Sequence, residues 1–134
     1  MGKILVINQC GGGVDPLRQS LTHEGHDINV VNSPQEASRL MSTEPFELAL
    51  IRCHAVAATL AYVLELKQQD PGMTIILMVT SSMVQMPYEA IQAGADGLVF
   101  RPFRVDRIRR AVVEGLKMHE LKAMYEEVPV AGGA

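Results

Sequence analysis

The sequence predicts a single α/β domain in which helices cover both faces of a parallel sheet. Five short apolar segments alternate with five segments of helical pattern. The apolar segments are continuous and do not alternate with polar residues, which indicates strands buried on both faces. Glycine and proline residues separate the segments, so the connections are short. A length of 134 residues and a hydrophobic content of 48% suit one domain of ordinary size.

Three strands and two helices are expected in the first half of the chain. The strands are predicted at residues 3–7, 28–31 and 47–52, with the first at the centre of the sheet. The first helix is expected over residues 16–24, with Asp15 as its N-cap and Gly25 after its end. Ser33 and Glu36 have the spacing of a capping box, so a second helix is expected from there to about residue 41.

The second half of the chain is predicted to contain three helices and two strands. Helices are expected over residues 57–69, 87–93 and 105–126, and strands over residues 74–80 and 98–100. Lys67 shares the helical spacing of the apolar residues Leu60, Val63 and Leu64. Gly94 suits the left-handed end of its helix, and Pro102 must end the last strand because proline lacks an N–H donor. In the last helix, Leu116, Leu121 and Met124 are expected to leave an apolar side uncovered.

This pattern is a flavodoxin-like (βα)5 three-layer sandwich with a parallel sheet of order 2-1-3-4-5. In such a sheet, functional residues gather at the carboxyl ends of the strands, near the switch point between the first and third strands. The segments expected there are residues 8–10, 52–54, 80–81 and 101–102.

The order of the elements and several short motifs resemble the receiver domain of bacterial response regulators, the CheY-like superfamily. The motifs are Ala-Gly-Ala-Asp-Gly at residues 93–97, Arg-Pro-Phe at residues 101–103, and Thr80-Ser81 after the fourth strand. The resemblance covers residues 1–120 and leaves residues 121–134 as an extended helix end and a flexible tail. It implies a role in two-component phosphorelay signal transduction, as a non-enzymatic domain.

The residues that carry the family's chemistry differ in this chain. The family has two acidic residues after the first strand, a phosphoacceptor aspartate after the third, a lysine after the fifth, and an aromatic switch residue. The same positions hold Asn8 and Gln9, then Arg52, then Arg101, and finally Leu98, so of this set only Thr80 matches. Neutral amides and a guanidinium are poor magnesium ligands, and a guanidinium is no nucleophile. We therefore expect a degenerate pseudo-receiver that has lost magnesium binding and aspartyl phosphorylation and uses no cofactor.

Other roles for this degenerate phosphorylation pocket remain open. Arg52 and Arg101 could pair with Asp15, Asp96 or backbone carbonyls in a purely structural way. Alternatively, they could bind a small anion or nucleotide together with Thr80, Ser81 and the backbone of residues 11–13. A third alternative is magnesium-dependent phosphorylation at an unforeseen acceptor.

Two further groups of residues are candidates for a site. Cys10, Cys53 and His54 follow strands that are expected to be neighbours, which makes a redox pair or a partial metal site geometrically possible. A buried structural role is the simpler interpretation of the cysteines. The glycine run at residues 11–13 does not have the G-x-G-x-x-G spacing of a dinucleotide site. The remaining histidines, His23, His26 and His119, are expected at the surface.

Charge and composition limit the partners. A net charge of -3 and a pI near 5.8 do not favour nucleic acid as a partner, and no apolar run is long enough to span a membrane. A cytoplasmic protein is expected. The resemblance implies a protein partner on the face formed by the fourth helix, fifth strand and fifth helix. Leu98 cannot act as the aromatic switch, so this face should stay in one state. The uncovered side of the last helix is expected either to bind a partner or to belong to the stub of a linker helix to an output domain. In either case we expect a homodimer through the fourth and fifth helices.

Overall fold

The computed structural model describes residues 2–8, 15–52, 56–79, 86–100 and 103–127 of the chain. Within these residues, five parallel strands form one sheet in the order β2-β1-β3-β4-β5. The strands are β1 (Lys3–Asn8), β2 (Asp27–Val31), β3 (Leu48–Arg52), β4 (Thr74–Val79) and β5 (Gly97–Phe100). The predicted class and strand order are confirmed.

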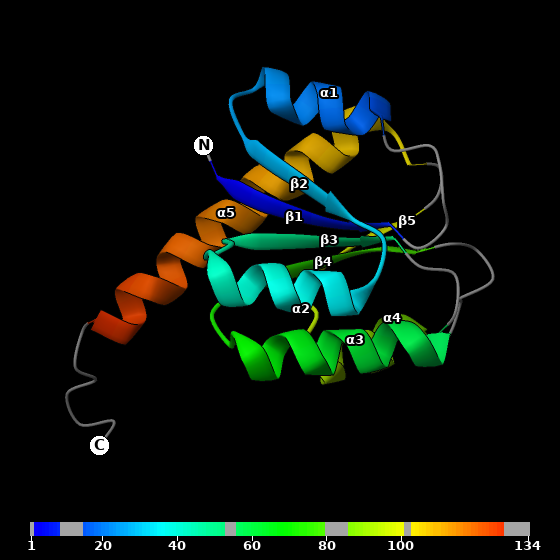
Figure 1. Cartoon of the computed structure of the whole chain (residues 1–134), viewed down its shortest axis with the longest axis vertical. Coiled ribbons are helices and arrows are strands. Elements are labelled where there is room, and N and C mark those ends of the chain that lie inside the picture. The colour runs from blue at the N-terminus through cyan, green and yellow to red at the C-terminus, as the bar shows by residue number, and fades with distance from the viewer. Residues whose placement is uncertain (1, 9–14, 53–55, 80–85, 101–102, 128–134) are drawn as a thin grey trace.

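Five helices complete three layers. They are α1 (Asp15–His23), α2 (Pro34–Thr43), α3 (Val56–Gln69), α4 (Met86–Ala93) and α5 (Val105–Glu127). Helices α1 and α5 cover one face of the sheet, and α2, α3 and α4 cover the other (Figure 1). Every predicted element is present among the described residues, with ends that differ from the prediction by one or two positions.

Alternating side chains of the central strands fill two apolar cores, because successive residues of a strand point to opposite faces of the sheet. Toward α1 and α5 lie Ile4, Val6, Leu48, Leu50 and Ile76. Toward α2, α3 and α4 lie Leu5, Ile7, Ala49, Ile51, Ile75 and Leu77. All of β4 is buried, as its unbroken apolar sequence predicts.

The helix ends follow the local signals, with one difference. Gly25 and Gly94 have φ values of 95° and 118° where α1 and α4 end. The Ser33 hydroxyl accepts a hydrogen bond from the N–H of Glu36, as in a capping box. The Glu36 carboxylate accepts from the N–H of Asn32, one residue before the donor that the capping box would use. The cap thus satisfies free backbone donors on both sides of Ser33.

His26 is buried, so its prediction as a surface residue is wrong. The residue is 8% exposed, and its Nδ1 accepts a hydrogen bond of 3.1 Å from the N–H of Gly2. Burial lowers the pKa of His26 below its ordinary value of 6.5, which agrees with a neutral ring that accepts at Nδ1. The hydrogen bond of His26 therefore connects the start of β1 to the loop before β2.

Helix α5 lies close to the sheet at Gly115. A Cβ atom there would lie 2.7 Å from Leu48 Cδ1, 3.1 Å from Ile76 Cδ1 and 3.3 Å from Thr74 Cγ2. All three neighbours are buried in the sheet and have little room to move. Glycine in a helix costs about 1 kcal/mol relative to alanine. At Gly115 the helix bears this cost, because a residue without a Cβ atom allows it to pack closely on β3 and β4.

We expect Gly115→Val to lower the free energy of unfolding by about 2 kcal/mol, because the new side chain must displace buried atoms of the sheet. Urea denaturation measures the loss. The control is Glu120→Val, which places the same residue at an exposed position of the same helix. Equal stabilities of the two variants would contradict the close approach.

Candidate functional site

Two polar residues lie side by side where β1 and β3 end. Asn8 and Arg52 are register partners on these neighbouring strands, and Arg52 is also the register partner of Met78 on β4. Asn8 is buried, with 4% of its surface exposed, whereas Arg52 is half-buried. The structure therefore brings together two of the residues that the strand order predicted at this edge.

The chemistry of this pair is that of a neutral amide beside a cation. The guanidinium of Arg52 stays charged at any physiological pH, and the amide of Asn8 carries no charge. Each of these two residues already takes part in an interaction within the chain. Across the described ranges, no three His, Cys, Asp or Glu side chains are grouped so that they could hold a metal ion.

The other residues predicted for this edge lie outside the described part of the chain. These are Gln9, Cys10, Cys53, His54, Thr80, Ser81 and Arg101, together with the glycines at 11–13. Their roles stay predictions. Leu98, at the position predicted for the switch residue, is half-buried and packs against the core on the α2, α3 and α4 side.

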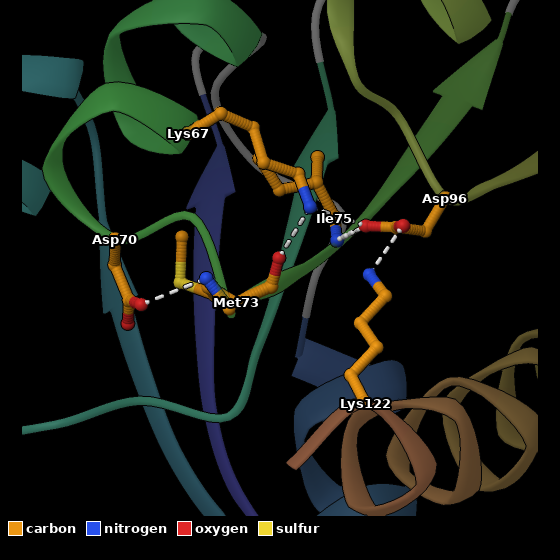
Figure 2. A network of polar contacts seen from close by, with 7 residues as sticks. Lys67, Asp70, Met73, Ile75, Asp96 and Lys122 are labelled. Atoms are coloured by element: carbon orange, nitrogen blue, oxygen red, sulfur yellow. Dashed lines mark hydrogen bonds and ion pairs between the residues drawn. The ribbon is translucent and has the colours of Figure 1, made fainter. Parts of the chain in front are cut away.

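A second polar cluster lies at the opposite edge of the sheet, before β5 (Figure 2). One carboxylate oxygen of Asp96, Oδ2, accepts from the N–H of Ile75 at 2.9 Å and from Nζ of Lys67 at 2.8 Å. The other, Oδ1, accepts from Nζ of Lys122 at 2.7 Å. Lys67 Nζ also donates to the carbonyl of Met73 at 2.7 Å. One carboxylate thus joins α3, β4 and α5 at the start of β5.

The Asp96 carboxylate is ionised despite its burial. Its side chain is only 14% exposed, and burial alone would raise its pKa. Hydrogen bonds from Lys122, Lys67 and Ile75 outweigh burial, so the pKa of Asp96 lies below its ordinary value of 3.8. Lys67 and Lys122 are the side-chain partners of Asp96, which lies at the opposite end of the strands from Arg52. The structural pairing of Arg52 and Arg101 with Asp15, Asp96 or backbone carbonyls stays a prediction.

Sequence reasoning missed Lys67 and Lys122. A signal for Lys67 was present, because its spacing places a charge on the apolar side of α3, where it needs an acidic partner. Lys122 had no such signal, because its contact with Asp96 depends on the path of α5 across the sheet.

Of the exposed large apolar side chains in the described residues, Leu64 lies on α3 and the others lie on α4, β5 and α5. The others are Ile91, Phe100, Val113, Met118, Leu121 and Met124. Leu121 and Met124 are 55% and 59% exposed, in agreement with the predicted uncovered side of α5. Leu116 is different: it is half-buried, packs against the core, and its side chain lies close to Gly2. The expectation that Leu116 is uncovered is therefore wrong.

Comparison with known proteins gives a family match. The family model of the response regulator receiver domain matches residues 4–113. Over 126 residues, the chain is 27% identical to the alginate biosynthesis transcriptional regulatory protein AlgB of Pseudomonas syringae pv. tomato. That alignment covers 93% of this chain and 28% of AlgB, so the chain spans little more than a quarter of this relative.

Solved structures show the same fold. A CheY-like response regulator receiver domain protein from Methanospirillum hungatei superposes with a TM-score of 0.81 at 20% identity, covering 91% of this chain and 98% of that one. NtrX from Brucella abortus in complex with ATP gives 0.85 at 21% identity, covering 96% of this chain and 29% of that one. In the part of the chain that the structure describes, no helix is long and apolar enough to span a membrane.

We expect Asp96→Asn to lower the free energy of unfolding at neutral pH by about 2 kcal/mol, because two lysines lose their shared charge partner. Because the pKa of Asp96 is lowered by folding, its stabilising effect is complete above the ordinary value of 3.8 and is lost as the pH falls through its lower folded value. Urea denaturation over a pH series measures both effects.

The control for this variant is Glu65→Gln, which removes an exposed carboxylate from α3. It should leave stability nearly unchanged. A wild-type advantage over Asp96→Asn that stayed constant down to the lowest pH would contradict the role of the ionised carboxylate.

Proposed function

Because the chain belongs to the response regulator receiver domain family, we propose that it is an atypical two-component receiver that signals by protein contact and not through its own phosphorylation. The observation that carries this proposal is the pair formed by Asn8 and Arg52 at the ends of β1 and β3. By resemblance to the family, these positions belong to an acidic residue and to the phosphoacceptor aspartate.

The chemistry of the pair supports the proposal. A divalent magnesium ion needs hard, preferably anionic oxygen ligands, which a neutral amide replaces poorly. A guanidinium next to the site repels the ion, and it has no lone pair with which to attack a phosphoryl group. The sequence adds Gln9 and Arg101 at the other family positions, which extends the same change of charge. We propose that the chain binds no magnesium and uses no cofactor in its role.

The surface formed by α4, β5 and α5 is the proposed interaction face. Exposed Ile91, Phe100, Leu121 and Met124 supply apolar area on all three elements. Full burial of one such side chain contributes about 1.5–3 kcal/mol, so even partial cover by another protein is favourable. Leu98 has neither the ring nor the hydroxyl of an aromatic switch. We propose that it leaves this face in one state.

The proposed setting is the cytoplasm. The proposed partner is a second signalling protein or an output domain that continues from α5. Two copies of the chain associate through α4 and α5. AlgB is called a transcriptional regulatory protein, and the chain spans 28% of its length. A receiver that is always in one state would give such a partner a constant signal.

We expect no covalent phosphorylation when the chain is incubated with acetyl phosphate and magnesium, because no carboxylate stands at the end of β3. Intact-mass spectrometry detects the addition of one phosphoryl group. The matched variant replaces Asn8, Gln9 and Arg52 by aspartate and restores the acidic set. Magnesium-dependent phosphorylation of the wild type would contradict the proposal and favour an unforeseen acceptor.

We expect Leu121→Lys combined with Met124→Lys to abolish self-association, because two charges would be buried in the proposed interface. Light scattering at high micromolar concentration measures the molecular mass. Leu64→Lys, at an exposed apolar position of α3, is the control and should leave a dimer. A wild-type monomer at this concentration would refute the dimer.

A further inference from the structure

A buried histidine at the amino ends of the strands has no part in the proposed function. His26 lies between α1 and β2, with 8% of the residue exposed. Its Nδ1 accepts a hydrogen bond from the N–H of Gly2 at 3.1 Å, and the carbonyl of Gly2 accepts one from the N–H of Asp27 at 2.9 Å. A ring nitrogen accepts only while it carries no proton. The bond from Gly2 therefore requires a neutral His26.

Gly2 also lies against helix α5. A Cβ atom at this residue would lie 2.6 Å from Cδ2 of Leu116, so the backbone before β1 runs close to the helix. Gly2 is buried, and its N–H is removed from water. If His26 ceased to accept, this buried N–H would lose its partner, which is unfavourable. The state of one ring thus affects a segment that is packed on α5.

Glu24 provides a second link between the ring and α5. Its Oε2 lies 3.8 Å from Nε2 of His26, and its Oε1 pairs with the guanidinium of Arg109 on α5. The guanidinium is always charged, whereas the imidazole is charged only when both nitrogens carry a proton. The same carboxylate therefore faces one permanent cation and one group that can become a cation.

We propose that His26 is a pH-sensitive switch that sets how firmly the start of β1 and helix α5 are held to the domain. With a neutral ring, Nδ1 accepts from Gly2, and Arg109 is the one cation that binds Glu24. When the ring takes up a proton, Nδ1 becomes a donor and the bond from Gly2 breaks. The charged ring also attracts Glu24 and weakens its pair with Arg109. Acid therefore loosens both attachments together, without any phosphoryl group.

The charged groups around the ring act in both directions. Burial lowers the pKa of His26 below 6.5, and the positive charge at the amino terminus also lowers it, whereas Glu24 and Glu47 raise it. Glu47 is already engaged, because it accepts from the N–H of Lys3 at 3.2 Å and lies 4.0 Å from Nδ1 of His119 on α5. The net result is a ring that is neutral at pH 7.

The direction of the pH effect follows from this lowered pKa. Because folding lowers the pKa of His26, its stabilising effect is complete above the ordinary value of 6.5 and is lost as the pH falls through the lower folded value. Asp96 does not titrate in the first part of this range, because its pKa lies below 3.8. A loss of stability that begins near pH 6.5 is therefore the sign of the histidine.

The test is an NMR titration of the whole chain between about pH 7.5 and pH 4.5, a range that brackets histidine protonation. The signals followed are the His26 ring, the Gly2 amide and the Nε–H of Arg109. We expect all three to shift together with one midpoint below 6.5. Urea denaturation over the same range measures the accompanying loss of stability.

The matched variant is His26→Asn, whose side-chain oxygen can accept from Gly2 and takes up no proton in this range. In this variant the Gly2 and Arg109 signals should stay constant, and its stability relative to the wild type should rise as the pH falls. His23→Asn and His119→Asn remove the rings of an exposed and a half-buried histidine and are the controls. Both should keep the pH dependence of the wild type.

Three results would overturn the switch. They are Gly2 and Arg109 signals that do not follow the His26 ring, the same pH dependence in His26→Asn, and loss of this dependence in His119→Asn. The wild-type titration decides the matter even if His26→Asn does not fold, because it needs no variant.

These results are separable from those for the proposed function. If the three signals shift together and the wild type accepts a phosphoryl group, the switch stands and the proposed function fails. If the chain resists phosphorylation and the signals do not shift together, the switch is wrong and the proposed function stands.

Discussion

Burial of the parallel sheet on both faces is the constraint on which the rest of the structure depends. The interiors of β1, β3 and β4 are apolar because helices cover them from both sides. The polar side chains of these three strands therefore lie where the strands begin and end. At the carboxyl ends of β1 and β3 lie Asn8 and Arg52, and before β5 lies Asp96 with its two lysines.

The amino ends and the carboxyl ends of the strands have different roles. At the amino edge, Asp96 is held by Lys67 and Lys122, so its charge is balanced and its position is set by three elements. A further ion pair, between Arg109 and Glu24, joins α5 to the loop after α1. Together these contacts orient α5, whose last turns extend past the sheet (Figure 1). The side of α5 next to β5 is thereby presented beside the exposed Phe100.

Much of the fold could be predicted because its signals are local. Apolar runs mark the strands, Gly25 and Gly94 mark helix ends, and the alternation of elements leads to the strand order that places Asn8 beside Arg52. The failures concern contacts between distant segments. The burial of His26 depends on where β1 begins, and the partner of Asp96 depends on the route of α5. No periodicity in the sequence carries that information.

The central claim is that the carboxyl edge does not take part in phosphoryl chemistry. Its most direct test is a heteronuclear NMR titration of the chain with magnesium and then with magnesium and beryllofluoride, which mimics an aspartyl phosphate in this family. The account predicts that the amide signals of Asn8, Arg52 and their neighbours do not move. Saturable shifts of these signals would contradict it and would indicate a receiver that is switched by phosphorylation.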